Sequence, residues 1–524
     1  MKIIQSSEIG KLIKDGDSVL LTGITGAFAE EAIYAIEDSF LQTAHPANLT
    51  FYWQAAVGDM DTKGLSHICH EGLMTRGIGG HLNGCGRRMT EFSRDNKAEI
   101  YNWPQGVCVA MMHAVAAHTP GVITKIGLKT FMDPRIDGGR MNKAAKDNLI
   151  ELIEIGGEEW LLYKAPQKLD VVLIRGTYAD EKGNISMDKE GYKLGQLAAA
   201  EAARATGGIV ICQVEDIVEA GTLNPKEVEV PGILVDYVFK AKPEYHWQTS
   251  ASVYNPVFAG KIRVPLNAVP RQPLSVKKIM ARRAAMELRK GNIVNLGVGT
   301  PTDISSIAAE EGCSDLFTLT TESGGIGGVP AAGNDFGCVW NGDAVIESGA
   351  IFDMYDGGTL DVGCLGFLEV GPNGDLNSSN RGGLGIGVGG FMNIAGGASK
   401  VVFLGAFTAG LHKGEGPEYE LGNGRLKIIK EGNCKKFIHK IAQISFSGEV
   451  ALDEHKEIYY VTERAVFKLV RAGLKLIEIA PGIDLQRDVL DQMEFRPIIA
   501  EDLHEMPAEI FNEEWGGLKK IMEE

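Results

Sequence analysis

The part of this sequence best suited to chemistry is a glutamate that stands just before a cluster of glycines. The apolar, β-branched run 316–321 predicts a buried strand, and Glu322 follows it, with four glycines within residues 324–328. A carboxylate at a strand end with so little bulk beside it can be approached closely by a large ligand and can act as a nucleophile. The backbone N–H groups of the glycines can face a developing negative charge. The alternative, commoner for such a residue taken alone, is a glutamate that only marks a strand-to-loop turn.

Three further features compete with Glu322 or complement it. The tripeptide Glu-Ser-Gly recurs at 347–349, and the residues alone leave Glu347 as a second candidate, although the glycines favour Glu322. The run 382–390 contains a GxGxxG match, but its six glycines make such a match nearly automatic, so we expect a ligand or oxyanion loop rather than a dinucleotide site. Gln105, in a loop before an apolar helical stretch, either donates to a substrate carbonyl or carboxylate or caps the helix.

These residues must be positioned by strands, and the sequence predicts an α/β fold with mostly parallel sheets. Short continuous apolar runs alternate with stretches of helical periodicity, a pattern typical of sheets covered by helices on both faces. In such sheets ligands bind beyond the carboxyl ends of the strands, which is where Glu322 is expected. The runs that predict buried strands are 171–175, 208–214, 233–238, 343–346, 400–405 and 474–479.

The chain carries the same order of elements twice, which predicts two related α/β domains. The order helix, turn, buried strand, glycine loop and helix occurs over 9–37 and again over 278–311. Between the two copies, residues 243–276 are rich in proline and aromatic side chains and lack periodicity. We therefore expect an N-terminal domain at 1–242, an inter-domain connection at 243–276 and a C-terminal domain at 277–524 that carries Glu322. The active site is expected in the cleft between the two domains.

The composition argues against several kinds of partner. The formal charge of the 524 residues is -17 and no Lys/Arg-rich arm occurs, so nucleic acid is not an expected partner. No apolar stretch of 18 residues and no signal-peptide core are present, so a membrane is not expected either. The eight cysteines include no CxxC pair, which predicts reduced thiols in the cytoplasm. His67, Cys69, His70, His81 and Cys85 lie close in sequence, but their spacing matches no zinc pattern, and we expect no metal site.

Taken together, many segments resemble the family I coenzyme A transferases, specifically the single-chain branch of propionate and short-chain acyl-CoA transferases. The resemblance covers nearly the whole chain. Segment 319–330 is similar to the one that carries the active glutamate of that branch, which selects Glu322 over Glu347. The other similar segments are 101–106, 131–135, 138–142, 174–181, 230–236, 352–361, 387–394, 462–467 and 478–486. The departures are small: Leu411 stands where a second glycine is expected, and the opening glycine loop 23–29 lacks a proline common there.

The resemblance implies a ping-pong transfer of CoA between a short-chain acyl-CoA and a free carboxylate, through a glutamyl-CoA thioester at Glu322. Acetyl-, propionyl-, butyryl-, lactoyl- and acetoacetyl-CoA are the substrates that it suggests. The expected oxyanion donors are the backbone N–H groups of Gly389 and Gly390 and the side-chain amide of Gln105. CoA is then a co-substrate, no tightly bound cofactor is expected, and the resemblance suggests a homotetramer.

Other roles stay open at this point. Gly297 and Gly299 follow a predicted strand and are candidates for contacting CoA, with a tight turn as the alternative. A short-chain acyl-CoA hydrolase, using the same glutamate with water as the acceptor, is the main rival among enzymes. A non-catalytic acyl-CoA or sugar-phosphate sensor is the rival from another class, and the intact Glu322 with its glycines argues against it.

Overall fold

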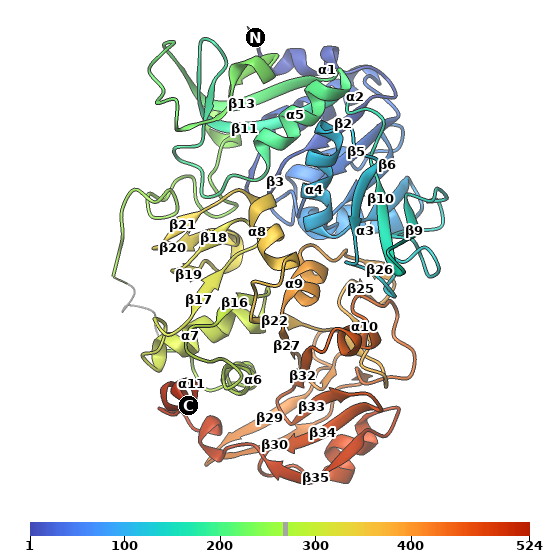
Figure 1. The fold of residues 1–524 in the computed structure, drawn as a ribbon, viewed down its shortest axis with the longest axis vertical. Coiled ribbons are helices and arrows are strands. Elements are labelled where there is room, and N and C mark those ends of the chain that lie inside the picture. Colours follow the sequence, from blue (N-terminus) through green and yellow to red (C-terminus); the bar gives the residue numbers. More distant parts are fainter. Residues whose placement is uncertain (266–270) are drawn as a thin grey trace. The chain divides into compact units, whose positions relative to one another are not determined.

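The described chain, residues 1–265 and 271–524 of a computed structural model, forms two compact units that are each discontinuous in sequence (Figure 1). The first unit contains 1–264, 321–353 and 383–393, and the second contains 265–320, 354–382 and 394–524. The sequence analysis expected continuous domains at 1–242 and 277–524, whereas two segments of the C-terminal half here belong to the first unit. Of the expected connection at 243–276, residues 266–270 lie outside the described residues.

A parallel sheet forms the centre of the first unit. Its strands are β1 (Lys2–Ile3), β2 (Ser18–Leu21), β5 (Leu49–Trp53), β6 (Met74–Gly79), β7 (Glu99–Asn102), β11 (Val171–Asp180), β13 (Ile209–Val218) and β15 (Tyr237–Lys240). They lie in the order β1-β15-β13-β11-β2-β5-β6-β7, and every neighbouring pair on this path is parallel. The order reverses between β2 and β11, because the strands that follow β2 add first on one side of it and later on the other.

Helices cover both faces of this sheet, as the continuous apolar strands predict. The helices of the first half are α1 (Ile9–Leu12), α2 (Glu30–Thr43), α3 (Arg87–Arg94), α4 (Gln105–Ala116) and α5 (Gln196–Thr206). Successive side chains of a strand point to opposite faces. Val19 and Leu21 of β2 accordingly share one apolar core with Ile33 of α2, while Leu20 lines a pocket with Met111 of α4. Both faces are therefore apolar, and α5 packs beside α4.

Shorter elements complete the first unit. They include an antiparallel group of β8 (Gly121–Thr124), β9 (Ile150–Ile155) and β10 (Glu158–Lys164), and the pair β3 (Gly23–Ile24) and β4 (Ala27–Phe28). The later segments add β18 (Gly325–Ile326), β19 (Val329–Pro330), β20 (Val339–Trp340) and β21 (Ala344–Val345). The small strands β12 (Ile185–Ser186), β14 (Val228–Val230) and β26 (Leu384–Gly385) also belong to this unit. Helices α8 (Ser348–Asp356) and α9 (Phe391–Gly397) begin in it and end in the second unit.

The second unit is built on a mixed sheet. Its main strands are β16 (Ile293–Leu296), β17 (Thr318–Thr320), β22 (Val362–Gly366), β27 (Lys400–Leu404), β32 (Glu457–Val461), β33 (Ala465–Val470), β34 (Gly473–Ile479) and β35 (Ile498–Glu505). The path β17-β16-β22-β27-β32 is parallel, and β33 pairs antiparallel with β32 and β34. The helices are α6 (Val276–Ala285), α7 (Asp303–Glu310), α10 (Gly448–Asp453) and α11 (Leu518–Glu523). Small antiparallel pieces are β23 (Glu369–Val370), β24 (Leu376–Asn377), β25 (Asn380–Arg381), β28 (Thr408–Ala409), β29 (Glu418–Gly422), β30 (Arg425–Lys430) and β31 (Cys434–Lys435).

The prediction of an α/β fold with mostly parallel sheets is confirmed. The two sheets also share an arrangement: β2 and β16 each lie between strands that follow directly in sequence and strands that come later. Two of the six predicted strands are shorter than their apolar runs. The run 233–238 begins as a 3-10 turn at 232–234 and enters the sheet only at Tyr237, and the run 343–346 gives only the two residues of β21.

Candidate active site

Glu322 lies in a tight turn just past the carboxyl end of β17. The N–H of Gly324 donates to the carbonyl oxygen of Thr321 at 3.0 Å, and the N–H of Thr321 donates to the carbonyl oxygen of Gly325 at 2.9 Å. Gly324 has a φ of +104°, and a Cβ there would overlap the carbonyl oxygen of Ile346. The carboxylate is therefore presented at the strand end as predicted, and the turn that presents it requires a glycine.

The glycine-rich run 382–390 is fixed by residues at the ends of β6 and β7. The side-chain amide of Asn102 donates to the carbonyl oxygens of Gly79 and Gly80, both at 2.7 Å, and its oxygen accepts the N–H of Val388 at 3.0 Å. The N–H of Gly389 donates to the carbonyl oxygen of Gly80 at 2.8 Å. This loop, expected to bind a ligand or an oxyanion, is thus held by hydrogen bonds to the first half of the chain.

The two glycines predicted as oxyanion donors have different partners. The backbone N–H of Gly390 hydrogen-bonds the carboxyl group of Glu322, and a Cβ on Gly390 would overlap Oε2 of that group. Only a glycine at 390 allows this approach. The N–H of Gly389 is already bound to the carbonyl oxygen of Gly80. A donor role for Gly389 stays a prediction, and this bond argues against it, whereas Gly390 directs its N–H at the carboxyl group of Glu322.

The surroundings of Glu322 change its acidity. The side chain keeps part of its surface exposed. Burial nevertheless raises the pKa of Glu322 from 4.5 to about 7, and the hydrogen bond from Gly390 opposes this rise. Desolvation acts in this direction because it disfavours the charged form of a carboxyl group. The carboxylate is therefore poorly solvated at neutral pH, a condition that makes it a stronger nucleophile, and titration near the working pH is typical of active-site groups.

Gln105, the first residue of α4, faces the same glycines. Its backbone N–H donates to the carbonyl oxygen of Gly389 at 2.8 Å, and the next N–H, of Gly106, donates to Oδ1 of Asn393 at 3.1 Å. The side-chain amide is 2% exposed and makes no hydrogen bond within the described residues, so it does not cap the helix. Its Oε1 lies 3.8 Å from the point where a Cβ on Gly389 would stand. Capping is therefore absent, and donation to a substrate by the Nε2 amide stays a prediction.

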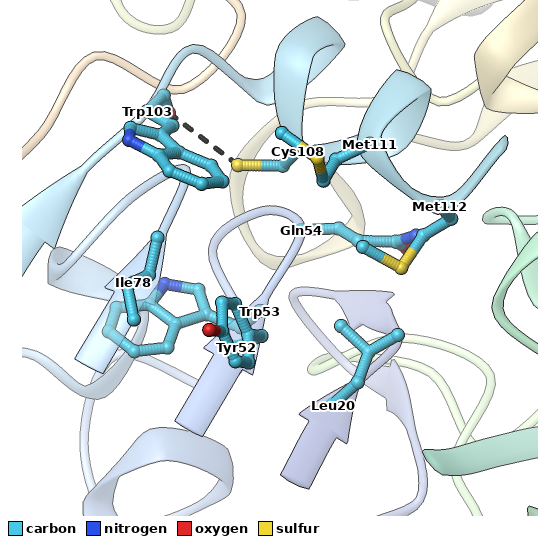
Figure 2. Close-up of a pocket in the computed structure, with 9 residues that line it drawn as sticks. All are labelled: Leu20, Tyr52, Trp53, Gln54, Ile78, Trp103, Cys108, Met111 and Met112. Carbon is cyan, nitrogen blue, oxygen red and sulfur yellow. Dashed lines mark hydrogen bonds between the residues drawn. The ribbon is translucent and has the colours of Figure 1, made fainter. Parts of the chain in front are cut away.

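A small pocket between α4 and the sheet shows how this helix is supported (Figure 2). It has about 10 Å³ of space for the centre of a water-sized molecule, which is room for one water and far too little for an acyl group. Nε2 of Gln54 and Nε1 of Trp103 are buried here without a hydrogen-bond partner among the described residues. The residues that line the pocket are Leu20, Tyr52, Trp53, Gln54, Ile78, Trp103, Cys108, Met111 and Met112. The side chains around the pocket join α4, whose first residue is Gln105, to the strands.

The second Glu-Ser-Gly tripeptide is used to begin a helix. The carboxyl group of Glu347 accepts the N–H of Gly349, in the first turn of α8, and the helix starts at Ser348. A carboxylate that accepts an N–H at a helix N-terminus is a stabilising cap. Glu347 therefore has this capping contact, whereas Glu322 is the glutamate that meets the glycine loop, and the choice of Glu322 as the reactive glutamate stays a prediction.

Gly297 and Gly299 belong to the second unit and form the turn between β16 and the 3-10 helix at 300–302. The hydroxyl of Thr302 donates to the carbonyl oxygen of Gly297 at 2.9 Å, and Gly299 has a φ of +91°. The tight turn, which was the alternative to CoA contact, is therefore present. Contact of these glycines with CoA stays a prediction.

Two histidines of the group at 67–85 pair with carboxylates. His67 lies between two carboxylates, with Nε2 3.0 Å from Glu30 and Nδ1 bonded to Glu37, and His70 binds Glu37 at 2.6 Å. Burial lowers the pKa of His67, but its bonds with these carboxylates outweigh burial and raise it to about 9. Within residues 1–265 and 271–524, no group of three or more His, Cys, Asp or Glu side chains is arranged to hold a metal ion. The same residues contain no helix long and apolar enough to cross a membrane.

Comparison with known proteins identifies the family. The model of the family described as coenzyme A transferase matches residues 3–241. The chain is 47% identical to caffeate CoA-transferase of Acetobacterium woodii over 528 residues, which cover 99% of each protein. The chain belongs to the coenzyme A transferase family. The present chain is also 39% identical to acetate CoA-transferase YdiF of Escherichia coli K12, over 97% of the present chain and 95% of YdiF.

Solved structures agree with this assignment. Crystal structures of YdiF from Escherichia coli O157:H7, as the apoenzyme and as a thioester complex with CoA, match with TM-scores of 0.92 and 0.91. Both are 38% identical and cover 98% of this chain and 97% of that one. The expected family and fold are confirmed, and the protein is a single-chain enzyme that transfers CoA between an acyl-CoA and a carboxylate.

Two residues of this transferase were not foreseen at the site. Asn102 holds the glycine loop, and the signal for it was a polar residue at the end of an apolar run three positions before Gln105. His81 was considered only as a metal ligand, yet its Cδ2 lies 3.6 Å from the Cβ position of Gly389. The signal in the sequence is the pair Gly79-Gly80 immediately before it, at the end of a strand.

Proposed function

We propose that this enzyme transfers CoA between a short-chain acyl-CoA and a free short-chain carboxylate by a ping-pong mechanism through a glutamyl-CoA thioester on Glu322. The observation that carries the proposal is the contact between the N–H of Gly390 and the carboxyl group of Glu322, at the tip of a glycine turn. The expected acyl groups are acetyl, propionyl, butyryl, lactoyl and acetoacetyl. They differ by single small groups, worth about 1–3 kcal/mol each in an apolar pocket, so one site can accept several of them.

The reaction begins with ionised Glu322. Its carboxylate attacks the thioester carbonyl carbon, the carbon–sulfur bond breaks, and a mixed anhydride and CoA thiolate result. The thiolate then attacks the glutamyl carbonyl carbon, releasing the first carboxylate and leaving CoA bound to Glu322 as a thioester. An acceptor carboxylate runs the same two steps in reverse and leaves as the new acyl-CoA.

Each attack creates an oxyanion, and the two oxyanions arise in different places. When the thiolate attacks the glutamyl carbonyl, the negative charge develops on the carboxyl oxygens of Glu322, to which Gly390 donates its N–H. That bond suits Gly390 as the donor for this second step. The first oxyanion forms on the carbonyl oxygen of the substrate, and the uncommitted amide of Gln105 is suited to this one. Losing one such donor typically lowers the rate by about 10²–10³.

A second class of carboxylate is favoured by one comparison. The relative that is 47% identical along almost the whole chain is named caffeate CoA-transferase, so a hydroxycinnamate is a candidate acceptor beside acetate and propionate. Competition between propionate and caffeate for the same enzyme–CoA adduct distinguishes the two: the preferred acceptor discharges the adduct faster at equal concentration.

The glutamyl thioester is tested by the intact mass of the protein after brief exposure to acetyl-CoA. The comparison is between the wild type, Glu322→Ala and Glu347→Ala, which removes the same side chain from the other Glu-Ser-Gly tripeptide. A CoA-sized adduct is expected on the wild type and on Glu347→Ala but not on Glu322→Ala, and propionate should discharge it. An adduct on Glu322→Ala would refute the assignment. Free CoA that accumulates without any carboxylate would favour the hydrolase.

The expected assembly is a homotetramer, which the family resemblance suggests. Sedimentation velocity of the purified protein measures the assembly directly. A mass near that of one 56.4 kDa chain would contradict the expectation.

A further inference from the structure

The hydrogen bond from the N–H of Gly389 to Gly80 removes one expected donor for the oxyanion that forms on the substrate in the first step of the proposed reaction. Two backbone N–H groups were expected from the glycine loop, but the N–H of Gly389 is bound to the carbonyl oxygen of Gly80 at 2.8 Å. The N–H of Gly390 meets the carboxyl group of Glu322. A tetrahedral oxyanion on the substrate is usually stabilised by more than one preorganised donor. Besides Gln105, a further donor is therefore expected beside Gly389.

His81 occupies that position. It is the second residue after β6, and Gly80, immediately before it, supplies the carbonyl oxygen that binds Gly389. The open side of Gly389, where a Cβ would project, has Cδ2 of His81 at 3.6 Å and Oε1 of Gln105 at 3.8 Å. The imidazole and the amide therefore line the same side of this glycine, next to the residue that contacts Glu322.

The hydrogen bonds of His81 define which nitrogen carries its proton. The N–H of Asn83 donates to Nδ1 at 3.1 Å, and because a backbone N–H can only donate, Nδ1 must be unprotonated and Nε2 carries the hydrogen. Burial also lowers the pKa of His81 to about 4, so the ring stays neutral at physiological pH. The backbone of the residue is fixed as well, since Nε1 of Trp53 donates to its carbonyl oxygen at 2.8 Å.

The proton on Nε2 has no acceptor among the described residues, which leaves it for a ligand. A neutral imidazole N–H with a fixed tautomer is a good oxyanion donor, because it stabilises charge without giving up its proton. The ring lies beside Gly389, the neighbour of the glycine whose N–H meets Glu322.

We propose that the Nε2–H of His81 donates a hydrogen bond to the carbonyl oxygen of the acyl-CoA while Glu322 attacks the adjacent carbon. This inference rests on the proposed function and assigns a further catalytic residue to its first step. The carbon–oxygen bond to Glu322 forms, the two electrons of the carbonyl π bond move to the oxygen, and they return as the carbon–sulfur bond breaks. His81 keeps its proton throughout, and Gln105 is the second donor.

A matched pair of substitutions separates donation from anchoring. His81→Asn places an oxygen where Nδ1 accepts the N–H of Asn83, but it removes the donor at the Nε2 position. His81→Gln places an amide N–H near the Nε2 position, but it removes the acceptor for Asn83. The rate of CoA-adduct formation from acetyl-CoA, followed by rapid quench and intact mass, is expected to fall by about 10²–10³ in His81→Asn and by less than about tenfold in His81→Gln.

Two outcomes overturn the proposal. The first is a rate for His81→Asn that matches the wild type to within threefold. The second is a rate for His81→Gln that is as low as that of His81→Asn, because that result would make the bond with Asn83, rather than the donor, the important feature. A thermal melt of each variant checks its folding, and if His81→Asn melts well below the wild type, His81→Leu takes its place against His81→Gln. If the wild type itself forms no adduct, the proposed function fails. If the wild type forms the adduct and the histidine variants keep its rate, only the role of His81 fails.

Discussion

Replacing Glu322 by glutamine is expected to stabilise the protein above pH 7. In the folded protein burial raises the pKa of this carboxyl group from 4.5 to about 7. At 1.36 kcal/mol for each pH unit between the two values, the ionised carboxylate lowers the free energy of unfolding by about 3 kcal/mol. This is an upper value, because the side chain is partly exposed and solvent screens part of the effect. Glutamine is neutral at every pH and its oxygen can still accept the N–H of Gly390.

The sign of the pH dependence follows from the two pKa values. Below pH 4.5 the carboxyl group is neutral in the folded and unfolded protein and has no effect on stability. Between pH 4.5 and about 7 the unfolded chain gives up the proton first, so the free energy of unfolding falls as the pH rises. Above about pH 7 both states are ionised and the full loss is present. In Glu322→Gln the free energy of unfolding does not show this fall between pH 4.5 and about 7.

The assay is denaturant unfolding of the wild type and Glu322→Gln at pH 5, 6, 7 and 8, with Glu347→Gln as a control for the loss of one negative charge. The transition is followed by tryptophan fluorescence, since five of the six tryptophans, all except Trp515, lie in the first unit with Glu322. The advantage of Glu322→Gln over the wild type is expected to grow by up to about 3 kcal/mol between pH 5 and pH 8. An advantage that is constant with pH, or that grows toward acid, would refute the reasoning that Glu322 is a desolvated carboxylate.

Three further outcomes are expected. The rate of CoA-adduct formation should rise with pH and level off above about pH 7, because only ionised Glu322 attacks in the proposed mechanism. A rapid-quench series from pH 5.5 to 8.5 measures this rate, and a rate that does not change with pH would contradict the expectation. Gly390→Ala should lower kcat by at least about 10² in steady-state assays, since its Cβ would overlap Oε2 of Glu322, and an unchanged kcat would contradict this. Glu463→Gln should destabilise the second unit by about 1–3 kcal/mol in calorimetry, because buried Arg464 loses one of its two carboxylates, 2.8 Å from its Nε, and keeps Glu431; an unchanged transition would count against this.

The elements that could be predicted from the sequence are those whose signal is local. Continuous apolar runs at 171–175 and 400–405 became β11 and β27, because a strand buried on both faces needs no polar positions. The prediction of a strand at 233–238 is wrong in its first half, where the chain forms a 3-10 turn at 232–234 and Ile233 is 82% exposed. An apolar run alone does not distinguish a turn from a strand.

The site was predictable only as far as its residues carry their own signal. Glu322 could be found because its glycines are adjacent in sequence. The different hydrogen-bond partners of Gly389 and Gly390 could not be predicted, since the N–H of Gly389 is bound by the carbonyl oxygen of Gly80, about 300 residues away in the chain. The same holds for His67, whose carboxylate partners come from α2, so its pattern in the sequence looked like a possible ligand set. Long-range hydrogen bonds decide these roles, and a single sequence does not contain them.

The discontinuous first unit has a consequence for the order in which the enzyme is made. Gln105 and His81 leave the ribosome early, but Glu322 and the glycine loop that complete the same unit are encoded in 321–353 and 383–393. Roughly 200 residues separate Gln105 from Glu322, which at about 5–20 residues per second is about 10–40 s of synthesis. A nascent or prematurely terminated chain therefore holds the sheet without Glu322, the nucleophile of the proposed mechanism. By that mechanism, such a chain cannot bind CoA as a thioester before nearly three quarters of it has been translated.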